Sequence, residues 1–315
     1  MPTIDSFFLT DPGQKRANNE DAVGTFEPKD SRQLKQSGRL YVVADGLGGH
    51  QFGERASQYA VENLLKLYFE APDIPPEKRL RDIIQQVNQK LIATARRELA
   101  SGEKMATTVV AAVVRGDTLQ VANVGDSRAY LIRGRQAASD APTLVRQSIK
   151  PRPVFFSVRV RLGRILGGKR PRREENKTVP EADLAMQQLS YDHSVVADQI
   201  RAGKLTPLQA LRSPKRNRLT QSLTPRRKEI NPFFYQAPFS SGDILLLCTD
   251  GLWGVVSEAI VQAVALELPP QEAAEKLVAL TLASGAPDNV TVVIARRRGV
   301  KVAVSYDEDE TNPGV

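Results

Sequence analysis

Cysteine, histidine and long apolar runs are scarce in this chain of 315 residues. Its single cysteine, Cys248, excludes an internal disulfide, and its two histidines, His50 and His193, exclude a zinc site built from several imidazoles. No apolar run approaches the ~20 residues that cross a membrane, and the first residues lack the basic and apolar regions of a signal peptide. These absences favour a cytoplasmic protein in which carboxylates hold any metal.

The net charge of the chain is +8, yet one segment accounts for it. Residues 146–177 contain eleven Lys or Arg and two Glu, a net charge of +9, so the remainder carries −1. The main body of the chain therefore lacks the general basic character of a nucleic-acid-binding protein. An apolar fraction of 41% and a charged fraction of 25% are those of a globular protein with a sizeable core.

The periodicity of apolar residues predicts an α+β protein. Strands are expected at residues 4–10, 22–26, 39–44, 107–114, 118–124, 127–133 and 289–296, and near Leu219, Phe233 and Ile244. Helices are expected at residues 53–68, 77–100, 195–202, 207–212, 257–267 and 270–283. The strands at 22–26 and 39–44 are expected to pair as a hairpin, and short turns between the strands from 107 to 133 indicate antiparallel pairing. Residues 134–189, which include the basic segment, fit no regular pattern.

Carboxylates stand at the ends of several predicted strands. Asp45 follows the apolar residues 40–44 and opens a turn rich in glycine, whose missing side chain lets the backbone approach a ligand. A lone aspartate there can simply cap a turn. Acids recur, however, beside other apolar runs, at Glu20, Asp21, Asp250 and Asp288. If they converge, each pair repels by roughly 4 kcal/mol at 4 Å, so cations are needed between them, and all-oxygen ligands suit magnesium or manganese.

Seven short motifs follow one another along the chain, at residues 16–21, 43–50, 105–108, 123–130, 192–194, 248–253 and 288–291. In this order they resemble the motifs of the bacterial PPM family, the metal-dependent Ser/Thr protein phosphatases of type 2C. Ala106 stands where that family usually has glycine. Any one of these motifs is weak alone, but seven in the right order are hard to obtain by chance.

The resemblance implies a fold and an activity. The fold is an α-β-β-α sandwich, in which two antiparallel sheets are flanked by helices. One catalytic domain is expected over residues 1–299, with a basic insertion at about 134–189 and a C-terminal tail at 300–315. The implied activity is hydrolysis of phosphoserine and phosphothreonine in proteins by a metal-activated water. The expected substrates are phosphorylated proteins, made by a cytoplasmic Ser/Thr kinase, and a monomer is expected.

The resemblance also implies a centre of two manganese or magnesium ions. Asp45 would bridge the ions, and the carbonyl oxygen of Gly46 would be a further ligand. The other ligands are implied at Glu20 and Asp21 for the first ion, directly or through water, at Asp250 and Asp288 for the second, and at Asp126 for a third, weaker site. Arg16 would bind the substrate phosphate, because its planar fork fits two phosphate oxygens at once.

Some of these residues keep a second interpretation. Asp126 lies in a hairpin turn, where aspartate is favoured without any metal. His50, close to the implied metals, is a candidate general acid for the leaving serine or threonine oxygen. Structural roles are expected for Thr107, Thr108, for Arg128 as the partner of an acid, and for residues 192–194 as a helix cap and packing contact.

The basic segment 146–177 leaves three interpretations open. It can be a cationic loop that recruits acidic or phosphorylated substrates, a surface for nucleic acid or an anionic membrane, or a solvated insertion. The alternative to the enzyme is a non-catalytic phosphatase-like scaffold or sensor that binds a protein partner. A degenerate scaffold has no chemical need for a full set of ligands. The motif Asp307-x-Asp309-x-Thr311 resembles that of aspartyl-phosphate phosphatases, but too little chain follows it for that chemistry.

Overall fold

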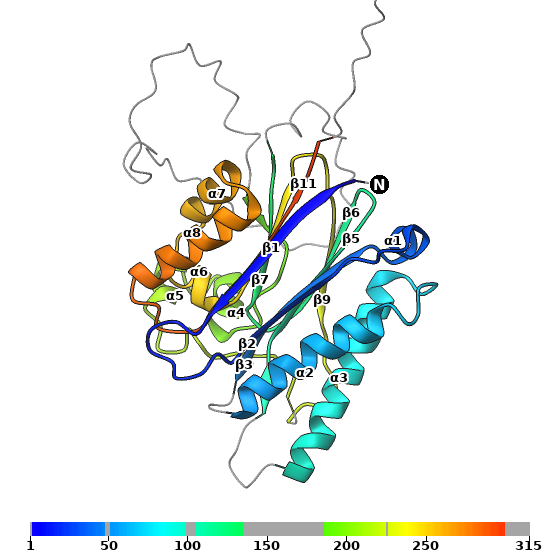
Figure 1. Ribbon diagram of the computed structural model, residues 1–315. Helices are drawn as coiled ribbons and strands as arrows, with labels where there is room; N and C mark the ends of the chain where they lie inside the picture. Colours follow the sequence, from blue (N-terminus) through cyan, green and yellow to red (C-terminus); the bar gives the residue numbers. More distant parts are fainter. Residues whose placement is uncertain (1, 48–50, 99–104, 135–185, 225, 300–315) are drawn as a thin grey trace, which may run out of the picture.

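Figure 1 shows the computed structural model, in which two β-sheets pack face to face and helices cover both outer faces. The structure describes residues 2–47, 51–98, 105–134, 186–224 and 226–299. The expected sandwich of two antiparallel sheets is confirmed. Within the described ranges, no helix combines the length and apolarity that crossing a membrane requires.

Each sheet is assembled from strands far apart in the sequence. The first sheet has the order β1 (Ile4–Asp11), β11 (Val290–Arg297), β10 (Ile244–Cys248), β7 (Arg128–Ile132) and β8 (Met186–Gln188). The second has the order β2 (Asp21–Phe26), β3 (Arg39–Leu47), β5 (Val109–Arg115), β6 (Thr118–Val124) and β9 (Phe233–Pro238), and β4 (Ala106–Thr107) pairs with the end of β3. All of these pairings are antiparallel.

Three layers of apolar side chains hold the sandwich together. Successive side chains of a strand point to opposite faces, so the apolar run of β3 serves two layers. Tyr41 and Val43 pack between the sheets, whereas Leu40, Val42 and Ala44 pack under the helices α2 (Gln51–Tyr68) and α3 (Pro76–Glu98). Full burial of such a side chain contributes roughly 1.5–3 kcal/mol. Burial on both faces explains why β3 reads as a continuous apolar run.

The first sheet repeats this arrangement on its outer side. Leu245 and Leu247 of β10 enter the layer between the sheets. Ile244, Leu246 and Cys248 face the helices α7 (Glu258–Glu267) and α8 (Pro270–Ala283). The remaining helices are the short α4 (Val195–Arg201), α5 (Pro207–Leu211) and α6 (Asp250–Trp253). The two sheets therefore share one core, and their strand ends meet at a common edge.

The expected hairpin is confirmed, since β2 and β3 pair from Asp21–Asp45 to Phe26–Leu40. The sequence missed helix α1 (Ser31–Ser37), which lies in the connection between these two strands. Asp30 caps this helix by accepting a hydrogen bond from the Gln33 amide at 2.7 Å. Polar side chains over one or two turns give little apolar periodicity, so the capping residue is the only sequence signal for such a helix.

Other differences concern short elements. The strand expected near Leu219 is wrong, because only an isolated bridge joins Leu219 to Ser194. Strand β8 lies at the end of the stretch that fitted no regular pattern. The helices expected at 195–202, 207–212, 257–267 and 270–283 are confirmed within a residue or two.

Candidate active site

A cavity of about 970 Å³ opens where the strand ends of both sheets meet. Its lining includes the end of β3, the turn between β6 and β7, the start of α6 after β10, and the residue pair before β11. Across from these strand ends, the lining continues with α3 and with the irregular segment 217–227. The cavity therefore has one side built on the sheets and another built on a helix and a loop.

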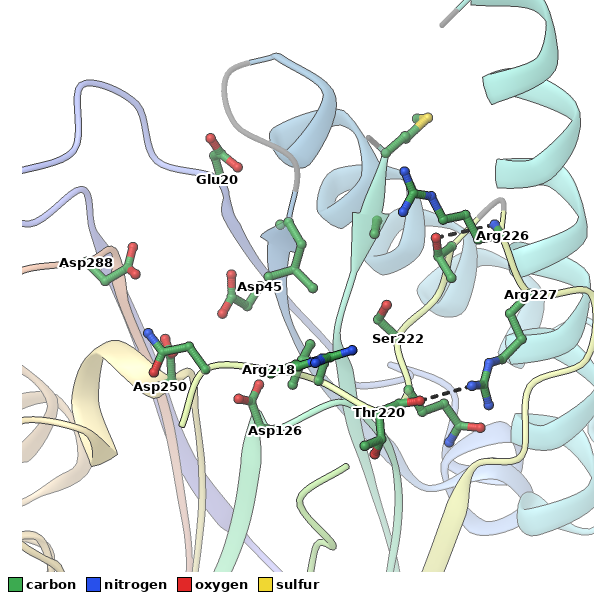
Figure 2. Close-up of a pocket in the computed structure, with 18 of the residues that line it drawn as sticks. Glu20, Asp45, Asp126, Arg218, Thr220, Ser222, Arg226, Arg227, Asp250 and Asp288 are labelled. Carbon is green, nitrogen blue, oxygen red and sulfur yellow. Dashed lines mark hydrogen bonds between the residues drawn. The ribbon is translucent and has the colours of Figure 1, made fainter. Parts of the chain in front are cut away.

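Five carboxylates line the side built on the sheets, and we call this group the carboxylate wall: Glu20, Asp45, Asp126, Asp250 and Asp288. Figure 2 shows these five side chains around one part of the cavity. Arg16 and Gly46 also line it. Most of the residues expected at a metal centre thus come together, although they are separated by up to 272 positions along the chain.

Asp45 is held in place through its backbone. Its amide donates to Thr108 Oγ1 at 2.9 Å, and its carbonyl oxygen accepts from the Thr108 amide and from Thr107 Oγ1, both at 2.9 Å. Thr108 Oγ1 also lies 2.7 Å from Ser127 Oγ, beside Asp126. The two threonines have the structural role expected of them. They fix the direction in which the Asp45 carboxylate enters the cavity.

The glycine turn after Asp45 allows close backbone packing. A Cβ atom on Gly46 would lie 2.5 Å from the carbonyl oxygen of Glu20 and 2.4 Å from that of Gly53. The Gly46 amide donates to the Glu20 carbonyl oxygen at 3.1 Å, and Ser57 Oγ donates to the same oxygen at 2.5 Å. Only glycine fits at position 46 without displacing these neighbours.

Asp21 lies directly opposite Asp45 in the β2–β3 pair but does not line the cavity. Its Oδ2 accepts hydrogen bonds from Thr249 Oγ1 at 2.8 Å and from Thr291 Oγ1 at 2.7 Å. Burial, and then the charge of Asp250, raises the pKa of the Asp21 carboxyl to about 7, although the two hydroxyls oppose the shift. Asp21 is a buried acid next to the carboxylate wall, and its implied role at a metal stays a prediction.

Burial and mutual repulsion raise the pKa values of three acids of the carboxylate wall. Burial is the main cause for Asp45, whose pKa lies well above its ordinary value, followed by the charge of Asp250. Burial and Asp250 also raise the pKa of Asp126 to about 8. Burial and Asp288 raise that of Asp250 to about 6. Each shift means that the ionised wall is unfavourable without a compensating positive charge.

Arg16 supplies part of this positive charge. Its Nη2 atom lies 2.8 Å from Asp288 Oδ2, and the pair is partly exposed. The hydrogen bond from Arg16 to Asp288 is the main cause of the raised Arg16 pKa. The residue expected to bind phosphate therefore contacts one of the acids expected to bind metal.

Asn289 is a positioning residue whose role the sequence analysis did not predict. Its Oδ1 accepts from the Glu20 amide at 2.8 Å, and its Nδ2 donates to the carbonyl oxygens of Pro12 at 2.8 Å and Asn18 at 2.9 Å. These bonds fasten the loop that carries Arg16 and Glu20 to the start of β11. The only local signal was an amide side chain directly after an acid at the start of a strand.

The turn that carries Asp126 is held from two sides. Trp253 Nε1 donates to the Asp126 carbonyl oxygen at 3.0 Å, and Arg128 stacks over the Trp253 ring at 3.7 Å from its centroid. Arg128 also pairs with Asp192 at 2.6 Å, which confirms the expected acid partner. The Gly125 amide donates to His193 Nδ1 at 3.2 Å. These contacts explain the turn geometry, and the metal role of Asp126 stays a prediction.

The motif at 192–194 has the structural role expected of it. Ser194 caps α4 by accepting from the Ala197 amide at 3.3 Å, and His193 contacts the Gly125 turn through its side chain and its backbone. His50, residues 135–185 of the basic insertion and the tail from residue 300 lie outside the described residues. The predictions made for them, including the general acid at His50 and the three interpretations of segment 146–177, therefore stay predictions.

The opposite side of the cavity was not foreseen from the sequence. Four arginines line the cavity beyond the carboxylates, and we call this group the arginine wall: Arg96, Arg218, Arg226 and Arg227, with Arg218 nearest the carboxylates in Figure 2. Residues 212–228 contain seven Lys or Arg and no Asp or Glu. That local charge was the available signal, and it is weaker than the net charge of +9 in segment 146–177.

Several known proteins resemble this chain in both sequence and fold. The family model described as Protein phosphatase 2C matches residues 14–147. The serine/threonine phosphatase stp of Listeria innocua is 30% identical over 296 residues, which cover 92% of this chain and 94% of that protein. The serine/threonine phosphatase Stp1 from Staphylococcus aureus has a TM-score of 0.70 at 28% identity, over 94% of this chain and 96% of that one.

A further solved structure contains metal ions. The catalytic domain of the serine/threonine protein phosphatase PstP, in complex with two manganese ions, has a TM-score of 0.67 at 26% identity, over 94% of this chain and 99% of that one. The sandwich and its cavity define the class, a phosphatase fold with an acidic site at the strand ends. The chain belongs to the PPM family, the type 2C protein phosphatases.

Membership of this family confirms the resemblance drawn from the seven motifs. The protein is a metal-dependent protein serine/threonine phosphatase, and manganese or magnesium is the cofactor of its family. Phosphorylated proteins are accordingly its substrate class. The comparisons favour this enzyme over the non-catalytic scaffold.

Proposed function

We propose that the carboxylate wall is the metal centre of this phosphatase. The observation that carries the proposal is the convergence of five carboxylates on one cavity, three of which, Asp45, Asp126 and Asp250, have raised pKa values. Carboxylate and carbonyl oxygens are the donors that magnesium and manganese prefer. The residues present therefore fit two such ions, and Asp45 would help to hold both. The proposed remaining ligands are the Gly46 carbonyl oxygen, Glu20, Asp21, Asp250 and Asp288, with Asp126 at a third site.

Within the described part of the chain, no three acidic, histidine or cysteine side chains already stand close enough to enclose an ion. When bound, the ions lower the pKa of a water molecule and neutralise charge on the phosphoryl group. Metal binding would then release protons from Asp45, Asp126 and Asp250, since burial raises the pKa values of these three acids.

Arg16 has the proposed task of orienting the substrate. It is partly exposed and reaches the wall at Asp288, so it can exchange that carboxylate for two oxygens of a phosphoryl group. The exchange couples substrate binding to a free Asp288. His50 stays our candidate for returning a proton to the leaving oxygen.

Cys248 has no part in the proposed chemistry. Its side chain is buried in the layer under α7 and α8, and burial raises the pKa of its thiol. A buried, protonated thiol is a poor nucleophile. Gly254 also stands where the arginine of a cysteine phosphatase would follow. The proposed nucleophile is water.

We further propose that the substrates are proteins phosphorylated by a Ser/Thr kinase, and that the enzyme acts as a cytoplasmic monomer. The domain limits 1–299, with the insertion at about 134–189 and the tail at 300–315, belong to the same proposal. One compact core shared by both sheets supports a single catalytic unit.

The test is hydrolysis of p-nitrophenyl phosphate and of a phosphothreonine peptide with Mn²⁺, with Mg²⁺ and with EDTA. We expect turnover with either metal, none with EDTA, and loss of turnover in Asp250→Ala. Asp82→Ala is the matched control, because Asp82 is an exposed acid on α3 that pairs only with Lys78. Metal-dependent turnover that survives in folded Asp250→Ala would refute the assignment of the metal centre.

A further inference from the structure

The cavity has two chemically opposite sides. In Figure 2 the labelled carboxylates lie on one side and Arg226 and Arg227 on the other, with Arg218 between them. The space between is lined by neutral polar residues, among them Thr220 and Ser222. A metal centre that binds one phosphoryl group does not by itself account for four further arginines in the same cavity.

The four side chains of the arginine wall are exposed to solvent. Within the described residues none of the four is paired with a carboxylate, in contrast to Arg16 at Asp288. Arg227 donates only to the backbone, from Nη2 to the Thr220 carbonyl oxygen at 3.1 Å. Unpaired arginines inside a concave site concentrate positive potential where an anion can bind.

The segment that carries three of these arginines is firmly held. Asn88 of α3, which is fully buried, donates from Nδ2 to the Arg227 carbonyl oxygen at 2.7 Å and accepts from the Thr224 amide at 2.8 Å. Leu223 and Thr107 exchange backbone hydrogen bonds at 2.9 and 3.0 Å. The same Thr107 holds Asp45. The arginine wall is thus preorganised relative to the carboxylate wall, which reduces the entropy lost on binding.

The cations that line this side are all arginines, and no lysine is among the described lining residues. The planar guanidinium fork matches two phosphate oxygens, whereas an ammonium acts as a point charge. A phosphorylated side chain carries about −1.5 to −2 charges and three strong acceptor oxygens. The wall therefore has the chemistry expected for a phosphoryl group.

We propose that the arginine wall is a second anion subsite, which binds a second phosphoryl group of the same substrate segment while the first is hydrolysed at the carboxylate wall. This inference rests on the proposed metal centre and names its preferred substrate, a multiply phosphorylated stretch of protein. Binding energy from the second group promotes reaction at the first, because both are attached to one chain.

The experiment compares three peptides that share one phosphothreonine. The first has no other charge near it, the second carries a non-hydrolysable phosphonate analogue of phosphoserine one to four residues away, and the third carries glutamate there. We expect the phosphonate at its best spacing to raise kcat/KM about tenfold in Mn²⁺, mainly through KM. Glutamate should raise it far less. A ratio near one at every spacing, or an equal effect of glutamate, would overturn the proposal.

Substitutions in the arginine wall test whether it causes the increase in kcat/KM. In Arg226→Gln/Arg227→Gln, and separately in Arg218→Gln, the ratio of kcat/KM between the phosphonate and singly phosphorylated peptides should fall towards one. Arg216→Gln is the matched control, an exposed arginine in the same segment that does not line the cavity, and it should keep the ratio. A ratio that persists in both wall variants contradicts the subsite. If the singly phosphorylated peptide is not hydrolysed at all, the metal centre itself is refuted.

Discussion

The two walls of the cavity are built in different ways. The carboxylate wall stands on strand ends and nearby turns, its side chains are buried or half-buried, and the backbone of Asp45 is held by Thr107 and Thr108. The arginine wall stands on one helix end and an irregular segment, and its side chains are exposed. Burying a charge costs several kcal/mol unless a partner charge or a metal offsets it, whereas an exposed charge costs little. The first wall is suited to catalysis and the second to selectivity.

The largest effect is expected at Asp45, where one substitution should lower activity but raise the stability of the metal-free protein. Asp45→Asn should lower kcat by roughly 10³-fold or more, because the proposed bridging ligand is lost. The same change should stabilise the metal-free protein by about 1 kcal/mol, since burial and neighbouring charges already disfavour the Asp45 carboxylate. Turnover with Mn²⁺ and thermal unfolding in EDTA measure the two effects. A metal-free protein that loses stability would contradict the repulsion argument, and Asp82→Asn serves as the control.

The stability of the metal-free protein should fall as the pH rises, because of the buried acids in and beside the carboxylate wall. The folded pKa values of Asp126, about 8, and Asp21, about 7, lie above the ordinary value of 3.8. The folded state then binds more protons than the unfolded state between these limits, so stability present at pH 4 is lost as the pH rises to 8. We expect a decrease on the order of 3 kcal/mol in EDTA, measured by urea unfolding.

Manganese gives the matching control for this pH dependence. The ion favours the ionised acids, so added Mn²⁺ should stabilise the protein more at pH 8 than at pH 5. Equal stabilisation at both pH values would mean that the acids with raised pKa values do not hold the metal.

A smaller effect is expected at Arg16, which faces both substrate and wall. Arg16→Gln should lower kcat/KM for a phosphothreonine peptide by about 10- to 100-fold, mainly through KM. It should also raise the apparent affinity for Mn²⁺, because Asp288 loses its competing partner. Metal titrations of activity and of intrinsic fluorescence distinguish these effects. Arg81→Gln, at an exposed arginine on α3 paired with Glu77, should change neither.

The smallest effect concerns the support of Asp45. Thr108→Val removes the hydroxyl that accepts from the Asp45 amide and contacts Ser127, so it should cost about 1–2 kcal/mol of unfolding free energy. Thr108→Ser keeps the hydroxyl and is the matched control. Equal losses in the two variants, measured by urea unfolding, would indicate a packing effect of the methyl group instead.

The sequence predicted the carboxylate wall better than its surroundings for a physical reason. Asp45, Asp250 and Asp288 follow or precede apolar strands, and such strands are recognisable locally because both of their faces are buried. Helix α1 and strand β8 were missed because they are short and bury little apolar surface. The strand expected near Leu219 was wrong, since that segment is held by side-chain and turn contacts instead of a sheet.

By itself, the sequence determined the strands, the long helices and the acids at the strand ends, because these depend on local periodicity and on residue types in a fixed order. Only the tertiary structure decided which charges meet. The pairing of Arg16 with Asp288 and the clamp of Asn289 on Glu20 join residues from opposite ends of the chain. The bond from Asn88 to Arg227 likewise places the arginine wall across from Asp45. Such contacts follow from the packing of two sheets and a helix, and no local pattern of side chains encodes them.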